Sequence, residues 1–125
     1  MSNPIKEKSF DFAVRIVNLS KWLKKQSHFE LSQQILRSGT SIGSNVEEAL
    51  AGQSKKDFAA KMAIASKEAR ETNYWLRLLI KCEILSEKKC RLILNESEQI
   101  IKLLTSIVKT CQTEIIKNSK LKIKN

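Results

Sequence analysis

Residues 86–115, SEKKCRLILNESEQIIKLLTSIVKTCQTEI, carry apolar or small side chains at steps of three and four residues. The stripe consists of Cys90, Ile93, Ser97, Ile100, Leu104, Ile107, Cys111 and Ile115. This spacing places its members on one face of an α-helix, and its near-heptad period favours packing against other helices. Ser86 precedes the stripe and is a preferred N-cap residue, so we predict a helix over about residues 86–117.

Three segments upstream have the same helical spacing. They predict helices over about residues 9–26, 28–51 and 54–84. In the first of them, Phe10 is expected to widen the buried stripe. Ser27 with Glu30, and Ser54 with Asp57, have the spacing of capping boxes. Four long amphipathic helices joined by short loops favour an all-α fold, an antiparallel up-down-up-down four-helix bundle.

The composition agrees with a single helical domain. Among 125 residues there are only three glycines and one proline, which argues against disordered, collagen-like and turn-rich all-β chains. We assign the bundle to residues 1–117 and a basic C-terminal tail, expected to be frayed, to residues 118–125. No apolar signal segment begins the chain, and the apolar stretch at residues 75–80 is interrupted by Arg77, so we expect a cytoplasmic protein.

Residues 37–45, RSGTSIGSN, place two glycines and several small polar residues inside a predicted helix. Each glycine costs about 1 kcal/mol relative to alanine in a helix interior. Small side chains let another backbone approach closely, which would compensate that cost. Gly39 and Gly43 therefore predict close packing within the chain, a break in the helix or a contact between subunits.

Residues for catalysis or metal binding are scarce. His28 is the single histidine, and the three cysteines form no CxxC pair, so neither a structural zinc site nor a di-iron site is expected. The odd cysteine count suits a reducing compartment. Glu47 and Glu48 are adjacent and point about 100° apart on a helix, so they do not form a facing carboxylate pair. We predict no catalytic residues, no metal site and no cofactor.

The charge is strongly basic. Lys and Arg total 23 against 13 Asp and Glu, which gives a formal +10, and removing the four lysines of residues 117–125 leaves +6. On the third predicted helix, six side chains lie within about 80° of arc at about 100° per residue. They are Lys56, Lys67, Arg70, Tyr74, Arg77 and Lys81. We call this set the ribbon; it extends about 37 Å at 1.5 Å per residue.

Three interpretations of the ribbon remain open. It is a solvated basic face, a contact for nucleic acid, or a contact for an acidic protein or a neighbouring subunit. Arginine forms bidentate contacts with phosphate, and an exposed tyrosine can stack on an unpaired base. The six ribbon residues are therefore the candidate nucleic-acid-binding residues.

Three stretches resemble a known family. Residues 34–49, QILRSGTSIGSNVEEA, resemble the signature of the 23S rRNA intervening-sequence protein family, also called the four-helix bundle protein family. Residues 54–58, SKKDF, and 64–72, IASKEARET, look like its following segments. The resemblance covers about residues 9–115. The matching signature residues are Arg37, Ser41, Asn45 and Glu48.

The resemblance implies an antiparallel four-helix bundle that assembles into a ring-like homopentamer, encoded within intervening sequences of bacterial rRNA genes. It implies no enzymatic activity and gives the four signature residues a structural role. Accessory proteins of diversity-generating retroelements look similar in fold and bind a reverse transcriptase. Our leading hypothesis is a non-enzymatic oligomer that binds structured RNA or DNA. The alternative is a scaffold for a partner enzyme, such as a reverse transcriptase, without direct nucleic-acid binding.

Overall fold

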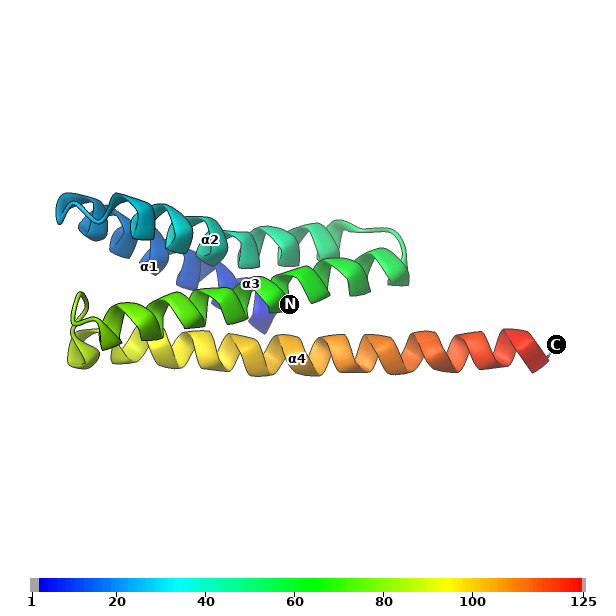
Figure 1. Ribbon diagram of the computed structural model, residues 1–125. Helices are drawn as coiled ribbons and strands as arrows, with labels where there is room; N and C mark the ends of the chain where they lie inside the picture. The colour runs from blue at the N-terminus through cyan, green and yellow to red at the C-terminus, as the bar shows by residue number, and fades with distance from the viewer. Residues whose placement is uncertain (1–2, 125) are drawn as a thin grey trace.

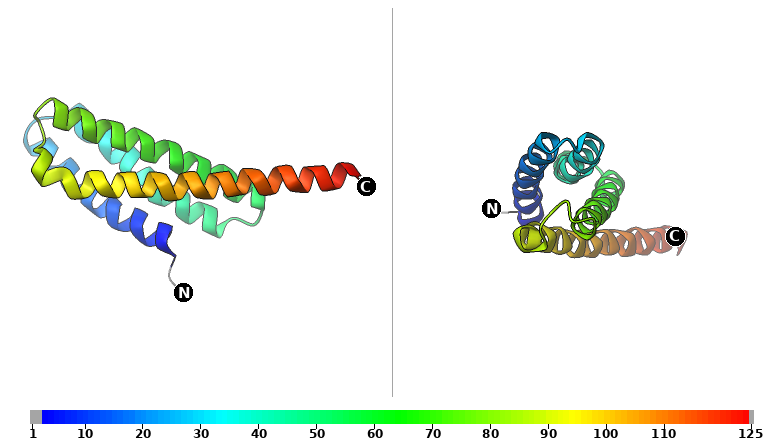
Figure 2. Two further views of the ribbon diagram at one scale, coloured as in Figure 1. Left: turned by 90° about the horizontal axis from the view of Figure 1, so that it is seen from below. Right: turned by 60° about the vertical axis from the view of Figure 1, so that its left-hand side comes forward.

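A computed structural model describes residues 3–124 of the chain. It contains four helices, α1 (Pro4–Lys25), α2 (Phe29–Ala51), α3 (Lys55–Lys81) and α4 (Glu87–Lys124). The helices surround a common interior, as the views in Figure 1 and Figure 2 show. No strand occurs in the described part of the chain. The all-α, four-helix prediction is confirmed.

Two helices are longer than the sequence pattern suggested. Helix α1 begins at Pro4 because proline suits the first helical position, and the Asn3 side chain accepts a hydrogen bond from the Lys6 N–H at 3.3 Å. Helix α4 continues to Lys124, seven residues past the expected end at residue 117. No glycine or proline interrupts residues 87–124. The proposed tail, as far as it is described, therefore continues the helix, and residue 125 lies outside the described residues.

The N-cap residues predicted for α3 and α4 are confirmed. The hydroxyl of Ser54 accepts a hydrogen bond from the Asp57 N–H at 3.0 Å. The hydroxyl of Ser86 accepts one from the Lys89 N–H at 3.4 Å. Each hydroxyl satisfies a backbone donor that the first helical turn leaves without a partner.

The predicted capping box at Ser27 is wrong. Helix α2 has His28 at its N-cap position, with no hydrogen bond from the His28 side chain to the helix. Ser27 instead ends α1 in the left-handed region, with φ of 66°. Its N–H donates to the Lys24 carbonyl at 3.0 Å, and the His28 N–H donates to the Leu23 carbonyl at 2.9 Å. This Schellman pattern uses Ser27 as the C-terminal cap of α1, so Ser27 does not cap α2.

The interior is apolar and contains side chains from all four helices. Its largest fully buried members are Phe12, Ile16, Leu23, Ile35, Ile42, Met62, Leu76, Leu79, Ile100 and Leu104. Along α4 the predicted stripe is buried from Cys90 to Leu104, whereas Ile107, Cys111 and Ile115 are half-buried. Helix α4 projects beyond the turn between α2 and α3, as Figure 1 shows, so the end of its stripe has fewer neighbours.

Small residues allow α1 and α2 to approach closely. The hydroxyl oxygens of Ser20 and Ser32 lie 2.7 Å apart, and the Ser32 hydroxyl donates to the Ser20 carbonyl at 2.8 Å. A Cβ atom added to Gly39 would lie 2.6 Å from Cγ2 of Ile16, and one added to Gly43 would lie 3.4 Å from the Ser9 carbonyl oxygen. Both glycines are buried against α1, so they support the interpretation of close packing within the chain.

Polar side chains join α1 to α4. Arg15 forms two hydrogen bonds with the Glu96 carboxylate, of 2.6 and 2.5 Å. Donating these hydrogen bonds to Glu96 raises the pKa of the Arg15 guanidinium. Lys8 also donates to the Gln99 side chain at 3.2 Å. These contacts close the bundle between its first and last helices.

Candidate nucleic-acid interface

All six residues of the ribbon lie on α3, so we call the set the α3 ribbon, and all six are exposed. They lie on the side of α3 that points away from the buried positions Met62, Ala65, Ala69, Thr72 and Leu76. Among the described residues, no carboxylate oxygen lies within 4.0 Å of a ribbon cation. The ribbon therefore presents positive charge that no acidic side chain of this chain neutralises directly.

Two ribbon arginines are held by neutral partners. Arg70 donates to the hydroxyl of Thr105 on α4 at 2.9 Å. Arg77 donates from Nε to the Asn73 side-chain oxygen at 2.8 Å, and Asn73 in turn donates to the Ser97 hydroxyl at 2.9 Å. A guanidinium has five N–H donors, so each arginine keeps donors for an anion. These bonds fix the arginine orientation without removing their charge.

Tyr74 lies between the two arginines along α3 and is 48% exposed. The guanidinium carbon of Arg77 is 6.0 Å from the centre of the Tyr74 ring, at the outer limit of a cation–π contact. The Trp75 ring meets the Tyr74 ring edge-on at 5.2 Å between centroids. A base can therefore stack on Tyr74 only on ring surface that these two neighbours leave open.

Two of the three acidic residues of α3, Glu68 and Glu71, face α2 instead of the ribbon. Arg37 of α2 pairs with Glu68 at 3.2 Å and also with Glu71. Glu71 accepts a further hydrogen bond from the indole N–H of Trp75 at 3.0 Å. This arrangement holds two carboxylates on the α2 side of α3, which separates them from the basic side.

The other signature residues also make contacts within the chain. Ser41 donates to the Arg37 carbonyl at 2.6 Å, and Asn45 donates to the Ser41 carbonyl at 2.8 Å. Glu48 lies 3.8 Å from the ammonium of Lys61 on α3. Arg37 and Glu48 thus contact α3, whereas the hydrogen bonds of Ser41 and Asn45 remain within α2.

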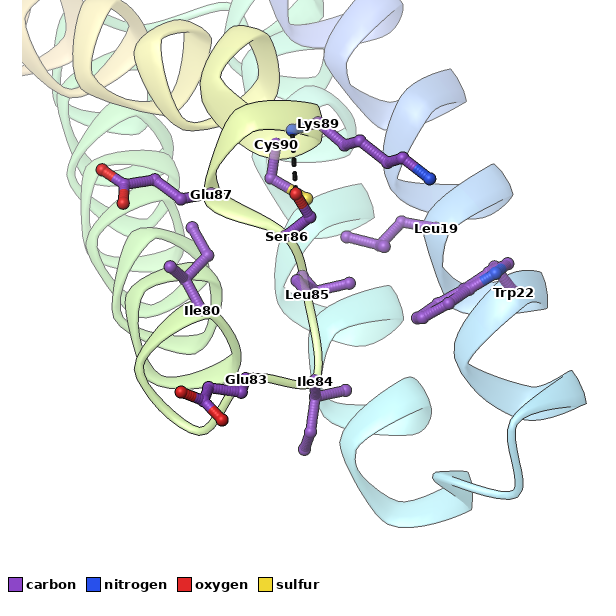
Figure 3. A pocket seen from close by; sticks show the side chains of 10 residues that line it. All are labelled: Leu19, Trp22, Ile80, Glu83, Ile84, Leu85, Ser86, Glu87, Lys89 and Cys90. Carbon is purple, nitrogen blue, oxygen red and sulfur yellow. Dashed lines mark hydrogen bonds between the residues drawn. The ribbon is translucent and has the colours of Figure 1, made fainter.

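A cavity of about 730 Å³ opens at the end of the bundle, where α3 turns into α4. Figure 3 shows Leu19 and Trp22 of α1 on one side of it and Ile80 of α3 on the other. The turn at residues 83–86 and the start of α4 complete its lining. Burial raises the pKa of the Cys90 thiol, which lowers the fraction of reactive thiolate. The Ser86 hydroxyl of the lining accepts from the Lys89 backbone N–H, the bond that caps α4.

Candidate metal-binding and reactive groups are also few elsewhere in the described residues. Residues 3–124 contain no group of three or more His, Cys, Asp or Glu side chains placed to hold a metal ion. The pKa of the half-buried Cys111 thiol is raised by burial and by the nearby Glu114 carboxylate. None of the described helices combines the length and apolarity needed to cross a membrane.

Sequence reasoning overlooked two surface features. Phe10 is predicted to be buried but is 59% exposed, because the buried positions of α1, such as Ser9, Phe12 and Ile16, lie on another side of the helix. Helix α4 also carries four exposed lysines on one side, from Lys102 to Lys120. Their spacing of seven, eight and three residues was the available signal.

The chain was compared with known proteins. The family model described as 23S rRNA-intervening sequence protein matches residues 1–106. A crystal structure of a protein of unknown function from the S23 ribosomal protein family of Bacteroides thetaiotaomicron VPI-5482 is similar, with a TM-score of 0.81. The two sequences are 55% identical, over 84% of this chain and 98% of the Bacteroides chain. No curated protein matches the chain.

The family match includes α1, α2, α3 and the first twenty residues of α4, so it contains both the signature and the α3 ribbon. Neither the family description nor the similar structure indicates an enzymatic family. The resemblance seen in residues 34–49 therefore extends over most of the chain, and this chain belongs to the 23S rRNA-intervening sequence protein family.

Proposed function

We propose that this chain is a non-enzymatic, cytoplasmic, antiparallel four-helix bundle that forms a ring-like homopentamer and binds structured RNA or DNA through the α3 ribbon. The observation that carries the proposal is the exposure of five cations on one side of α3 with no carboxylate within ion-pair distance among the described residues. A row of such cations can follow a phosphate backbone.

The charge distribution supports the same surface. Residues 55–125 contain sixteen Lys and Arg against eight Asp and Glu, a net +8. Residues 1–54 contain seven against five, a net +2. Most of the excess positive charge therefore belongs to α3, α4 and the turn between them, where a polyanion would be attracted most strongly.

Exposed apolar side chains support self-assembly through α1 and α2. Phe10 and Val14 lie one turn apart on α1 and are 59% and 49% exposed, and Leu36 of α2 is 38% exposed. Burying such side chains against a second copy would be favourable. A ring built in this way would repeat the α3 ribbon around its circumference and increase avidity for a long polyanion.

The test begins with the mass of nuclease-treated protein, measured by light scattering. Fluorescence anisotropy then follows binding to a labelled RNA stem-loop and to single-stranded DNA over a series of salt concentrations. The Arg70→Gln/Arg77→Gln/Lys81→Gln variant should flatten the plot of log affinity against log salt by about 2 to 3, because each lost phosphate contact removes about 0.7 to 0.9 from the slope.

A matched control separates phosphate contacts from net charge. The Lys21→Gln/Lys24→Gln/Lys25→Gln variant removes the same charge from exposed positions at the end of α1. It should keep the slope of the unmodified protein. Equal slopes in both triple variants would contradict the ribbon assignment, and absence of binding at low salt would contradict nucleic-acid binding altogether.

A second function is favoured by the same apolar surface. Phe10, Val14 and Leu36 could contact a partner enzyme, such as a reverse transcriptase, instead of another copy. The oligomer would then serve as a protein scaffold without direct contact to nucleic acid. Ring formation without salt-dependent binding would favour this second function.

A further inference from the structure

A second series of cations runs along α4. Lys102, Lys109, Lys117 and Lys120 are exposed, and within residues 3–124 none lies within 4.0 Å of a carboxylate oxygen. At about 100° per residue they fall within about 80° of arc, and they span about 27 Å at 1.5 Å per residue. We call these four residues the α4 lysine row.

The α4 lysine row lies beside the α3 ribbon. Arg70 contacts Thr105, and Asn73 contacts Ser97, so residue numbers rise along α3 as they fall along the adjacent α4. The opposite end agrees, because Lys55 and Lys56 line one surface hollow with residues 115–119. The two rows therefore run along neighbouring helices over most of the length of α3.

This register makes the rows complementary. Arg70 lies opposite Thr105, and Asn73 lies opposite Ser97. Moving from these pairs toward higher numbers on α4 and lower numbers on α3 places Lys109 level with about residues 61–66 of α3. That stretch is the gap in the ribbon between Lys56 and Lys67. By the same count, Lys102 lies level with Arg70. Positive charge consequently continues across the seam between α3 and α4 where the ribbon alone is interrupted.

The separation of the rows suits two phosphate strands better than one. Packed helices have axes about 8 to 10 Å apart, and side chains that point outward on both sides of the seam increase the distance between charges. The two backbones of a B-form duplex border grooves about 6 and 12 Å wide. A single extended strand offers one line of phosphates and would engage one row.

Two exposed carboxylates of α4, Glu98 and Glu114, flank the row or lie within it, while the third, Glu87, lies at the start of the helix. Glu98 lies toward the Arg77 end, and Glu114 lies near Lys117, but neither is within 4.0 Å of a lysine nitrogen of the row. The strongest positive region is therefore the part of the seam between Lys102 and Lys109, opposite Arg70 and Lys67.

We infer that the α4 lysine row and the α3 ribbon form one two-row surface for double-helical nucleic acid, with each row contacting one phosphate backbone. The inference rests on the proposed function, because it assigns the ribbon to one of the two strands. It extends the binding surface past residue 106, where the family match ends, to Lys117 and Lys120.

The test compares paired and unpaired ligands at equal length. The probes are a DNA duplex of about 11 base pairs, which matches 37 Å at about 3.4 Å per pair, an RNA hairpin whose stem has the same number of pairs, and oligouridine. The Lys102→Gln/Lys109→Gln/Lys117→Gln variant is compared with the Lys21→Gln/Lys24→Gln/Lys25→Gln control. Circular dichroism melting verifies that each variant remains folded.

The row variant should lower the salt slope by about 2 to 3 on a duplex and leave the slope on oligouridine unchanged. The loss of slope is compared between the RNA stem and the DNA duplex, and the larger loss identifies the preferred nucleic acid. If the row variant matches the control on both duplexes while the ribbon variant loses binding, the two-row inference is overturned and the proposed function stands. If the unmodified protein binds no probe at low salt, both fail.

Discussion

The two helical hairpins of this bundle differ in what they expose. The α1–α2 hairpin has small residues at its seam and nearly balanced charge. The α3–α4 hairpin has the larger share of the positive charge and two basic rows on its outer side. Both hairpins expose apolar side chains, such as Phe10 and Val14 on the first and Ile64 and Ile116 on the second, so charge is what distinguishes their surfaces.

The largest expected effect concerns assembly. Phe10→Asp/Val14→Asp should convert the oligomer to a monomer, because two buried charges would oppose association at the α1–α2 surface. Light scattering measures the mass. Ile64→Asp/Ile116→Asp is the matched change on exposed residues of α3 and α4, and it should preserve the oligomer while weakening RNA binding. Loss of mass in the second variant alone would reverse the assignment of the two surfaces.

The close approach of α1 and α2 can be tested with two alanine substitutions. Gly39→Ala should destabilise the fold by about 1 to 3 kcal/mol through overpacking, because the new methyl group meets the branched side chain of Ile16. Gly43→Ala adds its methyl at ordinary contact distance and should be neutral or stabilising. Urea unfolding measures both, and equal effects would argue against a special constraint at Gly39.

Arg37 of α2 contributes ion pairs to the contact between the hairpins. Arg37→Gln should cost about 1 kcal/mol of stability, since the pairs with Glu68 and Glu71 are partly exposed. It should also weaken RNA binding slightly, because two carboxylates near the ribbon lose their partner. Urea unfolding and anisotropy measure these effects. A change in binding without any change in stability would instead indicate that Arg37 contacts RNA directly.

The smallest effects are expected at the turns. Ser27 and Glu83 have φ of 66° and 62°, a region that glycine adopts without a steric penalty from Cβ. Ser27→Gly and Glu83→Gly should each raise stability by up to about 1 kcal/mol, measured by thermal unfolding. Ser27→Ala is the control and should give no such gain, because alanine retains Cβ. A similar gain from alanine would mean that backbone strain is not the cause.

Helical spacing alone predicted the number of helices, most of their boundaries and the buried stripe of α4. Local competition explains the errors at the ends. Ser27 has a residue type that could cap α2 or end α1. In the structure, Ser27 and His28 donate backbone hydrogen bonds to the last turn of α1, so Ser27 ends α1. The end of α4 was misplaced because a lysine-rich composition suggested fraying, whereas no residue near position 117 breaks the helix.

The candidate site was only partly accessible to such reasoning. The α3 ribbon follows from the helical period, but its separation from Glu68 and Glu71 depends on Arg37, which comes from another helix. The position of Lys109 opposite the gap in the ribbon depends on the register between α3 and α4, which the bonds of Arg70 and Asn73 reveal. Contacts between helices are tertiary, so a period within one helix does not contain them.

The most direct test of the division between the hairpins is a lysine footprint. The protein is acetylated with and without a saturating RNA stem-loop, and mass spectrometry quantifies modification at each lysine. We expect protection of Lys67, Lys81 and Lys109 and unchanged labelling of Lys21 and Lys24. Protection confined to the α1 lysines, or equal labelling at every position with RNA bound, would contradict the assignment of nucleic-acid binding to the α3–α4 hairpin.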